Sequence, residues 1–513
     1  MSRVGRSPSL RRRWDRLVLQ VEGRLDSAGA DRMLPWLSAS TVFIVFLALD
    51  AAALRSIEGG SGLAPWLQAS WRRQHAMAGQ PIGGFDPARA TWSFVSEPIL
   101  WLTRYVPPEA VFSIVQAAAI ALAVVPLWNL ARDEAKLRVG AAEVILTAFA
   151  LSPTLHRANL STFHPELIAL PALLWAYLQA RRGHWKRYSV LVLLVLLCRA
   201  DLGLTVAALG LLVVFERKRR PGLLTMVAGL TWTITAALVL QPDTPDRALT
   251  PAGEFVARAV APLAAFPQVV FHPIIEGREL LAEPSVIFLV VVLAPLLFLP
   301  LMSPRKLFVA LPCLVLAMIA DRAVQRVAQQ GVLDLSPAAA HVGPAIGFVF
   351  VALVFALERI GIPSVTRVNI DRRVLLALLA GATLLFVTEA PTSPYRQPWQ
   401  WGSRDAVAGA KMVAADLVGP NAAVAVSPSS SALVAERADV IELPTDPADL
   451  TPFRLSQVAR QVDVVFLDTS GVNPRTGDPR WTTAQVERTL ERLRTQAFRV
   501  TFEAEGIYLL NSG

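Results

Sequence analysis

Charged residues are scarce in this chain. Asp, Glu, Lys and Arg together make up 17% of the 513 residues, whereas 54% are hydrophobic. Soluble globular domains carry about 25% charged residues, and disordered chains are poor in hydrophobic ones. The composition therefore argues against both classes and predicts an integral membrane protein.

Cysteine is also scarce. The two cysteines, Cys198 and Cys313, both lie in apolar runs, so they provide neither a disulfide framework nor a thiolate metal site. The polar C-terminal part lacks a glycine-rich phosphate loop, and no internal repeat is visible.

The net charge of +9 does not predict nucleic-acid binding, because Arg and Lys are concentrated in short loops and at the N-terminus. Residues 1–32 contain eight Arg and no apolar core, which a cleavable signal peptide would need. We predict that these residues form a cytoplasmic basic tail.

Long apolar runs recur through the chain, and a helix needs roughly 20 apolar residues to cross a membrane. We predict an α-helical polytopic membrane domain over residues 33–390, with about 11 spans in the plasma membrane. The predicted spans are 33–53, 109–131, 140–155, 164–180, 188–199, 202–215, 222–240, 285–302, 307–320, 340–357 and 374–390.

Basic residues predict the orientation of these spans, because loops rich in Lys and Arg face the cytoplasm. The long loops 54–108 and 241–284 are poor in basic residues for their length and are predicted to lie outside. The loops predicted to be cytoplasmic are 132–138, 181–187, 216–220, 303–306 and 358–373.

The same charge rule divides the apolar stretch 188–215. A single helix would place the basic loops on either side of it on opposite faces of the membrane. Two short helices that meet at Arg199 and Asp201 keep both loops inside. Short or broken helices are tolerated only where protein or water covers their ends, so we expect a polar cavity opening outward here.

Residues 391–513 follow the last predicted span and are expected to form a small, soluble, extracytoplasmic α/β domain. Its pattern alternates buried strands with an amphipathic helix. The predicted elements are strands at 422–427, 440–443 and 462–467, a helix at 482–497, and a terminal hairpin of 498–502 with 507–510.

His164 and Glu166 stand at the start of an apolar helix on the predicted outer side. They can simply begin the helix, with Ser161 as its cap and Glu166 near the positive end of the dipole. They can also bind a polar headgroup. Two residues two positions apart lie about 200° apart on a regular helix, so both could not face one ligand there.

Arg199 and Asp201 also have two interpretations. They can form an ion pair that seals the corner between two helices. Alternatively, the planar fork of Arg199 can clamp a phosphate, and Asp201 can hold a metal or orient the arginine. Ionisable groups at the edge of an apolar layer are candidates for function by default.

Further candidates lie on the same predicted side of the membrane. His341 opens the tenth predicted span and can be either a packed residue or a ligand. Asp86 and Glu97 are the acids of the first outer loop, where Asp86 also fits an ordinary turn.

Several of these segments together resemble a known family. Phe163 to Glu166, Arg199 to Gly203, the span 293–305, and His341 with Pro344 occur in the order seen in a bacterial family of predicted membrane proteins of unknown function. That family is grouped with the C-type glycosyltransferases, which transfer a sugar from a polyprenyl-phosphate carrier to an acceptor outside the membrane. The resemblance covers nearly the whole chain.

The first outer loop departs from that family. Gln68 and Trp71 keep part of a family segment. The position at which the family carries an acid, just before that segment, falls near Gly62, where this chain has none. In C-type enzymes an acid in this loop is the usual catalytic base or metal ligand. Asp201 keeps the terminal acid of another family segment. The missing loop acid makes an inactive, lipid-binding relative a real alternative.

The resemblance implies a C-type glycosyltransferase-like fold and an enzyme that uses a lipid-phosphate-linked sugar at the outer membrane face. Its partners would be membrane lipid, a polyprenyl-phosphate-sugar donor and a cell-envelope acceptor, with no nucleic acid. The cofactor stays open, with a divalent metal as one candidate. A scaffold and a transporter are the alternatives, although a transporter should show inverted repeats. The substrate-binding candidates are His164, Arg199 and His341, and the catalytic candidates are Asp201, Glu166, Glu97 and Asp86.

Overall fold

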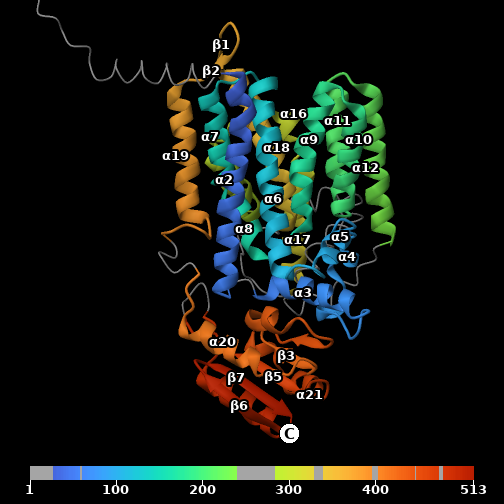
Figure 1. Cartoon of the computed structure of the whole chain (residues 1–513), viewed down its shortest axis with the longest axis vertical. Coiled ribbons are helices and arrows are strands. Elements are labelled where there is room, and N and C mark those ends of the chain that lie inside the picture. The colour runs from blue at the N-terminus through green and yellow to red at the C-terminus, as the bar shows by residue number, and fades with distance from the viewer. Residues whose placement is uncertain are drawn as a thin grey trace, which may run out of the picture.

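The chain folds into a bundle of helices with a small α/β domain at one end, as the computed structural model shows (Figure 1). The structure describes residues 27–57, 60–239, 283–328, 339–395, 402–444, 446–472 and 478–512. Most of the predicted basic tail 1–32 and of the predicted loop 241–284 lies outside these residues. We call the end of the bundle next to the α/β domain the domain end, and the opposite end the far end.

The helices of the bundle range from nine residues in α8 to 28 residues in α2. Their bounds are α2 Ala28–Arg55, α6 Pro108–Asn129, α7 Val139–Ala150, α8 Pro153–Ser161, α9 Ala169–Arg182, α10 Trp185–Cys198, α11 Leu202–Phe215, α12 Arg219–Val239, α15 Glu283–Leu293, α17 Leu311–Ala328, α18 Ala339–Ile360 and α19 Arg372–Glu389.

Several of these helices mark the chain as embedded in a membrane. Within the described ranges, four are long and apolar enough to cross a membrane, and the bent pair α7 and α8 makes a fifth if it counts as one span. The four are Gly29–Arg55, Pro108–Glu134, Arg219–Val239 and Val342–Ile360. The remaining apolar helices are shorter, so the predicted number of 11 spans stays a prediction.

Two predicted spans are interrupted at prolines. The span 140–155 bends by 42° between α7 and α8, where Pro153 begins the second helix. The span 285–302 is helical only to Leu293 and continues as two short 3₁₀ turns. Proline lacks the N–H that an α-helix needs and clashes with the preceding turn, which explains why an apolar run did not become one helix.

The predicted break in 188–215 is confirmed. Helix α10 ends at Cys198, Arg199 has an extended backbone with φ −166°, and α11 begins at Leu202. The segment before α5 pins this corner, because Val95 N–H donates to Leu197 O at 3.2 Å and Ala200 N–H donates to Thr91 O at 3.1 Å.

Helices α11 and α12 pack unusually closely just beyond the corner. Glycines line the contact on both helices, and the backbone of one helix touches that of the other. A Cβ on Gly210 would lie 2.5 Å from Met226 N and 2.7 Å from Gly222 O. Small residues allow such close approach between helices in a membrane.

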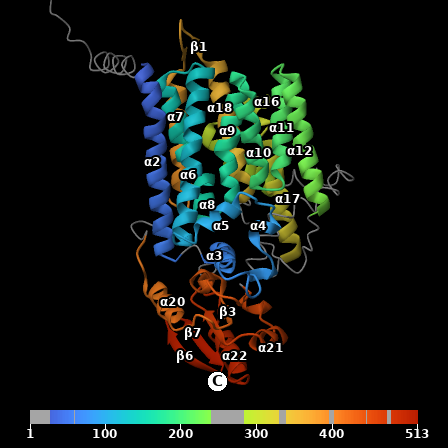
Figure 2. The ribbon, with the colours of Figure 1, turned by 45° about the vertical axis from the view of Figure 1, so that its right-hand side comes forward.

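The predicted loop 54–108 is largely helical. It contains α3 Gly60–Gln74, α4 Pro87–Ala90 and α5 Ser96–Leu102, and α3 lies across the domain end, between the bundle and the α/β domain (Figures 1 and 2). This layer covers the ends of the bundle helices, as broken helices in a membrane require.

Residues 402–512 contain a five-stranded sheet of order β4-β3-β5-β7-β6. The predicted strands are present as β3 Val424–Val426, β4 Val440–Glu442 and β5 Val464–Asp468, and the hairpin as β6 Phe498–Ala504 with β7 Ile507–Ser512. β3 is parallel to β4 and β5, and β7 is antiparallel to both neighbours.

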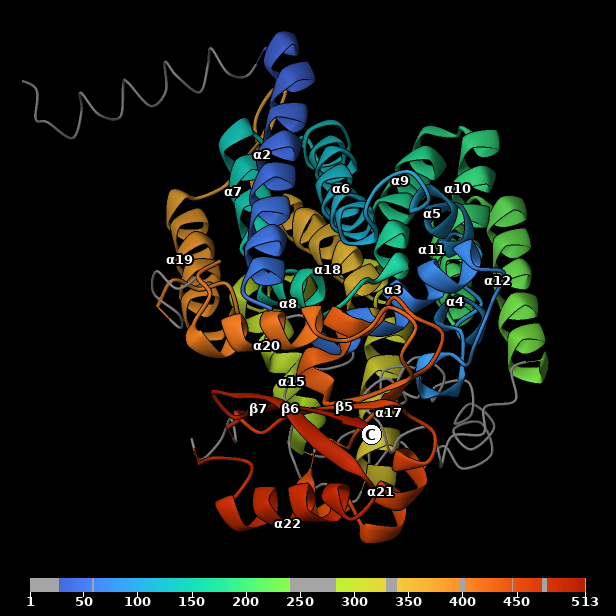
Figure 3. The same cartoon turned by 60° about the horizontal axis from the view of Figure 1, so that its bottom comes forward.

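The sheet lies between helices α20 Ala406–Asp416 and α22 Thr483–Arg494 (Figure 3). On the α20 face, Val426 and Phe466 share one apolar core with Trp66 of α3 and Phe112 of α6. The second face packs on Leu490 and Leu493 of α22. The α/β domain and the domain end of the bundle therefore share a continuous core.

Hydrogen bonds from Gln68 also join α3 to the α/β domain. The Gln68 Nε2 amide of α3 donates to the carbonyls of Arg437 and Ala438, both at 3.3 Å, and Gln68 Oε1 accepts from Ile82 N at 2.6 Å. Gln68 is 1% exposed, so these bonds satisfy an amide that would otherwise be costly to bury.

The close packing of α11 and α12 makes a specific prediction. Gly210→Ala should lower the melting temperature of the purified full-length protein, because overpacking a tight contact costs about 1–3 kcal/mol. Gly409→Ala is the matched control: it lies in α20 with nothing within 4 Å of the added Cβ, and alanine in a helix gains about 0.5–1 kcal/mol over glycine. Equal melting temperatures for the two variants would contradict the packing.

Candidate functional site

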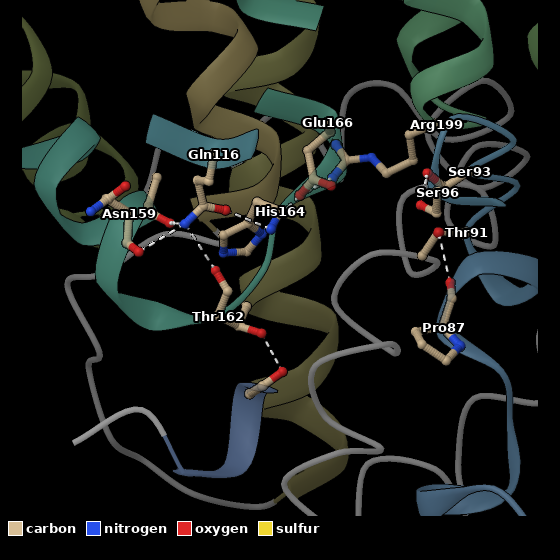
Figure 4. A network of polar contacts seen from close by, with 12 residues as sticks. Pro87, Thr91, Ser93, Ser96, Gln116, Asn159, Thr162, His164, Glu166 and Arg199 are labelled. Carbon is tan, nitrogen blue, oxygen red and sulfur yellow. Dashed lines mark hydrogen bonds and ion pairs between the residues drawn. The ribbon is translucent and has the colours of Figure 1, made fainter. Parts of the chain in front are cut away.

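Four of the predicted site residues meet at the domain end of the bundle, and Figure 4 shows three of them, His164, Glu166 and Arg199. Arg199 pairs through Nε with Asp201 Oδ1 at 2.6 Å and through Nη2 with Asp201 Oδ2 at 3.0 Å. Its Nη1 lies 3.3 Å from Glu166 Oε1, which in turn lies 2.9 Å from His164 Nδ1. We call these four residues the charged cluster.

Local backbone structure brings His164 and Glu166 together. Helix α8 ends at Ser161, Thr162 is fully extended, and His164 precedes a short 3₁₀ turn, Pro165–Ile168, before α9 begins. The separation of about 200° that a regular helix would give does not apply here, because His164 precedes a 3₁₀ turn and is not in a regular helix. The expected cap is wrong, because Ser161 belongs to the preceding helix.

Gln116 of α6 holds this turn in place. Its Nε2 donates to the carbonyls of Ala158, Asn159 and Thr162 at 3.2, 2.8 and 3.2 Å, and its Oε1 accepts from His164 N at 2.8 Å. Sequence reasoning missed Gln116. The available signal was a single amide inside a long apolar helix, which had no visible partner in the sequence.

The charged cluster is almost completely shielded from solvent. His164 and Glu166 are 3% and 4% exposed, and Arg199 and Asp201 are each 1% exposed. A buried charge is tolerated only when it is paired and hydrogen-bonded. The ion pair that seals the helix corner is therefore confirmed, whereas phosphate binding by Arg199 stays a prediction.

Asp86 and Glu97 gather around a different arginine. Arg73 of α3 lies 2.8 Å from Asp86 Oδ2 and 2.7 Å from Glu97 Oε1, and Asp86 also caps α4 through Ala88 N and Arg89 N. Burial alone would lower the pKa of the Arg73 guanidinium, but hydrogen bonds with Glu97 and Asp86 outweigh it and raise that pKa.

His341 is the remaining site residue predicted from the sequence. His341 lies in the first turn of α18, Ala339–Ile360, and its side chain is outside the described part of the structure. In the ranges that are described, no three His, Cys, Asp or Glu side chains are arranged to hold a metal ion.

A polar cavity lies beside the charged cluster, between the domain ends of α2 and α6 and the turn after α8. The cavity holds about 30 Å³ of space, room for little more than a water molecule and well below the roughly 300–1,000 Å³ of small-molecule pockets. Its polar lining residues are Asp50, Glu109, Ser113, Gln116, Asn159 and Thr162. Sequence reasoning missed Asp50, although an acid inside a predicted span is a recognised signal.

The four hydrogen bonds of Gln116 predict a large effect of its replacement. Gln116→Leu should destabilise the protein by about 2–3 kcal/mol, because each buried polar group left without a partner costs about 1–3 kcal/mol. Gln179→Leu is the control, since Gln179 is equally buried at 4% exposure and its side chain has one bond, to His184 Nδ1 at 2.9 Å. Thermal unfolding of both variants in detergent measures the difference, and a smaller loss for Gln116→Leu would contradict the assigned role.

Comparisons with known proteins place this geometry in context. A comparison with curated proteins finds no match. The arabinofuranosyltransferase AftD from Mycobacteria aligns at 14% identity and TM-score 0.45, over 93% of this chain and 40% of AftD. An oligosaccharyltransferase from Archaeoglobus fulgidus aligns at 14% identity and TM-score 0.38, over 84% of this chain and 70% of the enzyme.

The chain thus spans less than half the length of AftD, and both TM-scores lie below 0.5, so neither alignment decides the activity. The family comparison is decisive for classification. Residues 94–509, which contain the charged cluster and the sheet, match a single family model. The chain belongs to the family described as "Predicted membrane protein (DUF2079)".

Proposed function

We propose that this protein is a glycosyltransferase-like membrane enzyme that acts on a lipid-phosphate-linked sugar at the outer face of the plasma membrane. The observation that carries the proposal is the buried charged cluster of His164, Glu166, Arg199 and Asp201. Charged groups are expensive in an apolar helix bundle and are retained where they serve a site.

The distribution of basic residues supports a multi-pass orientation with the domain end outside. The loops 132–138, 181–187 and 216–220 lie at the far end, where Arg181 lies 2.8 Å from Glu134 and 3.2 Å from Glu216. Basic loops mark the cytoplasmic side of a membrane protein. The N-terminus of α2 would then be cytoplasmic, and both the cluster and the α/β domain would be extracytoplasmic.

The chemistry of the cluster suits a phosphate-bearing donor. Transfer of a sugar from a lipid phosphate requires positive charge on the leaving phosphate. Arg199 carries a positive charge that can attract phosphate oxygens, and Asp201 holds the guanidinium in one orientation by accepting hydrogen bonds from its Nε and Nη2. His164 can supply a second donor once its contact with Glu166 is exchanged for substrate.

One observation favours a second candidate, a catalytically inactive protein that binds lipid or displays the α/β domain as a scaffold. Every predicted catalytic carboxylate is already paired with an arginine: Asp86 and Glu97 with Arg73, and Glu166 and Asp201 with Arg199. A carboxylate held by an arginine is a weaker base than a solvated one, because the positive charge favours its ionised form.

Lipid-phosphate binding tests the proposal. The full-length protein, purified in detergent, should retain added undecaprenyl phosphate in native mass spectrometry. Arg199→Lys keeps the charge but removes the fork, and it should weaken binding by about tenfold, or ~1.4 kcal/mol. Arg182→Lys is the control, because Arg182 pairs with Asp133 at the far end.

The outcomes separate the two candidates. Unchanged binding by Arg199→Lys would contradict the proposed role of the cluster. Release of sugar from an undecaprenyl-phosphate-linked donor by the wild type supports an enzyme, whereas tight binding without release supports the inactive lipid-binding candidate.

A further inference from the structure

Five cations gather at the far end of the bundle, where α10 and α12 begin. Helices α10, α11 and α12 pack on one another there (Figures 1 and 2). The basic residues lie at the start of α10, at the start of α12 and in the link between α11 and α12, and all of them are exposed. We call these residues the basic patch: Lys186, Arg187, Arg217, Arg219 and Arg220.

The basic patch lacks the acidic partners that neighbouring cations of the far end have. Arg182 lies 2.7 Å from Asp133, and Arg181 lies 3.2 Å from Glu216, the acid nearest to the patch in the link. Among the residues that the structure describes, no carboxylate forms an ion pair with a member of the patch. Neither α10 nor α12 has an acid in its first turn. The positive charge of the patch is therefore not compensated by this part of the protein.

Helix stability does not account for these cations. The start of a helix carries partial positive charge, which disfavours Lys and Arg there. Lys186 and Arg187 nevertheless follow directly after the first residue of α10, and α12 begins with Arg219 and Arg220. An anion bound beside the patch would turn this repulsion into attraction, so the patch is suited to a negatively charged ligand.

Contacts between α10 and α12 fix the two halves of the patch relative to each other. Tyr188 OH donates to Thr225 Oγ1 at 2.9 Å. Lys218 Nζ lies 5.3 Å from the centre of the Trp185 ring and donates to Arg181 O at 2.9 Å. Because the two helix starts are already held together, less freedom is lost when a ligand binds across them.

Apolar surfaces of the same helices continue from the basic patch towards the middle of the bundle. On α10, Val190 and Leu193 are 67% and 53% exposed, and on α12, Leu224 and Val227 are 72% and 58% exposed. Exposed apolar surface of this kind marks contact with lipid in a helix long enough to span a membrane, as α12 is. A ligand with a phosphate group and acyl chains matches both surfaces, whereas a soluble phosphate compound matches only the patch.

We propose that the basic patch binds acidic phospholipids, such as phosphatidylglycerol, in the membrane leaflet that meets the far end of the bundle. In the orientation proposed above this is the cytoplasmic leaflet, where acidic lipids attract basic residues next to a membrane helix. The inference goes beyond the proposed function, because the patch and the charged cluster lie at opposite ends of the bundle.

Native mass spectrometry of the full-length protein in detergent tests the inference. The probes are dioleoyl-phosphatidylglycerol and dioleoyl-phosphatidylcholine, which have the same chains, and each is titrated to give a Kd. The wild type should bind phosphatidylglycerol at least about tenfold more tightly. Arg219→Gln combined with Arg220→Gln should weaken phosphatidylglycerol binding by about tenfold, whereas Arg219→Lys with Arg220→Lys keeps the charge and should retain it.

Arg372→Gln combined with Arg373→Gln is the matched control. These residues begin α19 at the same end of the bundle (Figure 1), and Asp371 beside them supplies an acid that accepts from Arg373 N at 2.9 Å. The Kd for phosphatidylglycerol should stay within about twofold of the wild type. Equal weakening by the two double Gln variants would show only general attraction of charge and would overturn the patch.

Further measurements make the outcome decisive. Phosphatidylcholine binding reports whether each variant is folded, and if the α12 variant is not, Lys186→Gln with Arg187→Gln on α10 decides by the same criterion. Equal Kd values of the wild type for the two lipids would overturn the inference. So would displacement of phosphatidylglycerol by an equal concentration of sn-glycerol 3-phosphate, which would assign the patch to a soluble phosphate compound.

The same preparations separate this inference from the proposed function. If phosphatidylglycerol binding depends on Arg219 and Arg220 but undecaprenyl phosphate does not bind, the basic patch stands and the lipid-linked donor is rejected. If undecaprenyl phosphate binding depends on Arg199 but phosphatidylglycerol is not preferred, the proposed function stands and the basic patch is rejected.

Discussion

The buried ion pair of Arg199 and Asp201 constrains the whole domain end of the bundle. A guanidinium that is 1% exposed is tolerated only with carboxylates in direct contact, so the chain must break its helix at residues 199–201 and bring Glu166 from a distant turn. The segment before that turn is held by Gln116, whose amide donates hydrogen bonds to three of its carbonyl groups. The contacts of one buried charge thus connect the end of α10, the start of α11 and the turn before α9.

Breaking helices inside a membrane protein exposes backbone groups that need partners. The segment that contains α3, α4 and α5, at the domain end of the bundle, supplies them. Thr91 O and Val95 N bond directly to the corner between α10 and α11. Helix α3 covers the domain end, and its Trp66 side chain packs in the apolar core that it shares with the α/β domain. The α/β domain is therefore part of the structure that closes the site, in addition to any surface that it presents.

The acids at the domain end fall into two physical classes. Those paired with Arg73 and Arg199 have their charge compensated inside the protein. Asp50 and Glu109 instead line a narrow cavity together with Asn159, whose buried Oδ1 has no hydrogen-bond partner.

The sequence by itself determined the membrane character, the helix break at Arg199, and the strands of the α/β domain, because hydropathy and charge placement are local properties. It also pointed to His164, Glu166, Arg199 and Asp201, since charge inside apolar runs is visible without a structure. Only the tertiary structure decided which acid faces which arginine, that Gln116 joins two helices, and that Asp50 lines a cavity. Partners that are separated in the sequence, by 13 residues for Arg73 and Asp86 and by 48 for Gln116 and His164, are chosen by packing, and a lone amide or acid in a helix shows nothing of what it will meet.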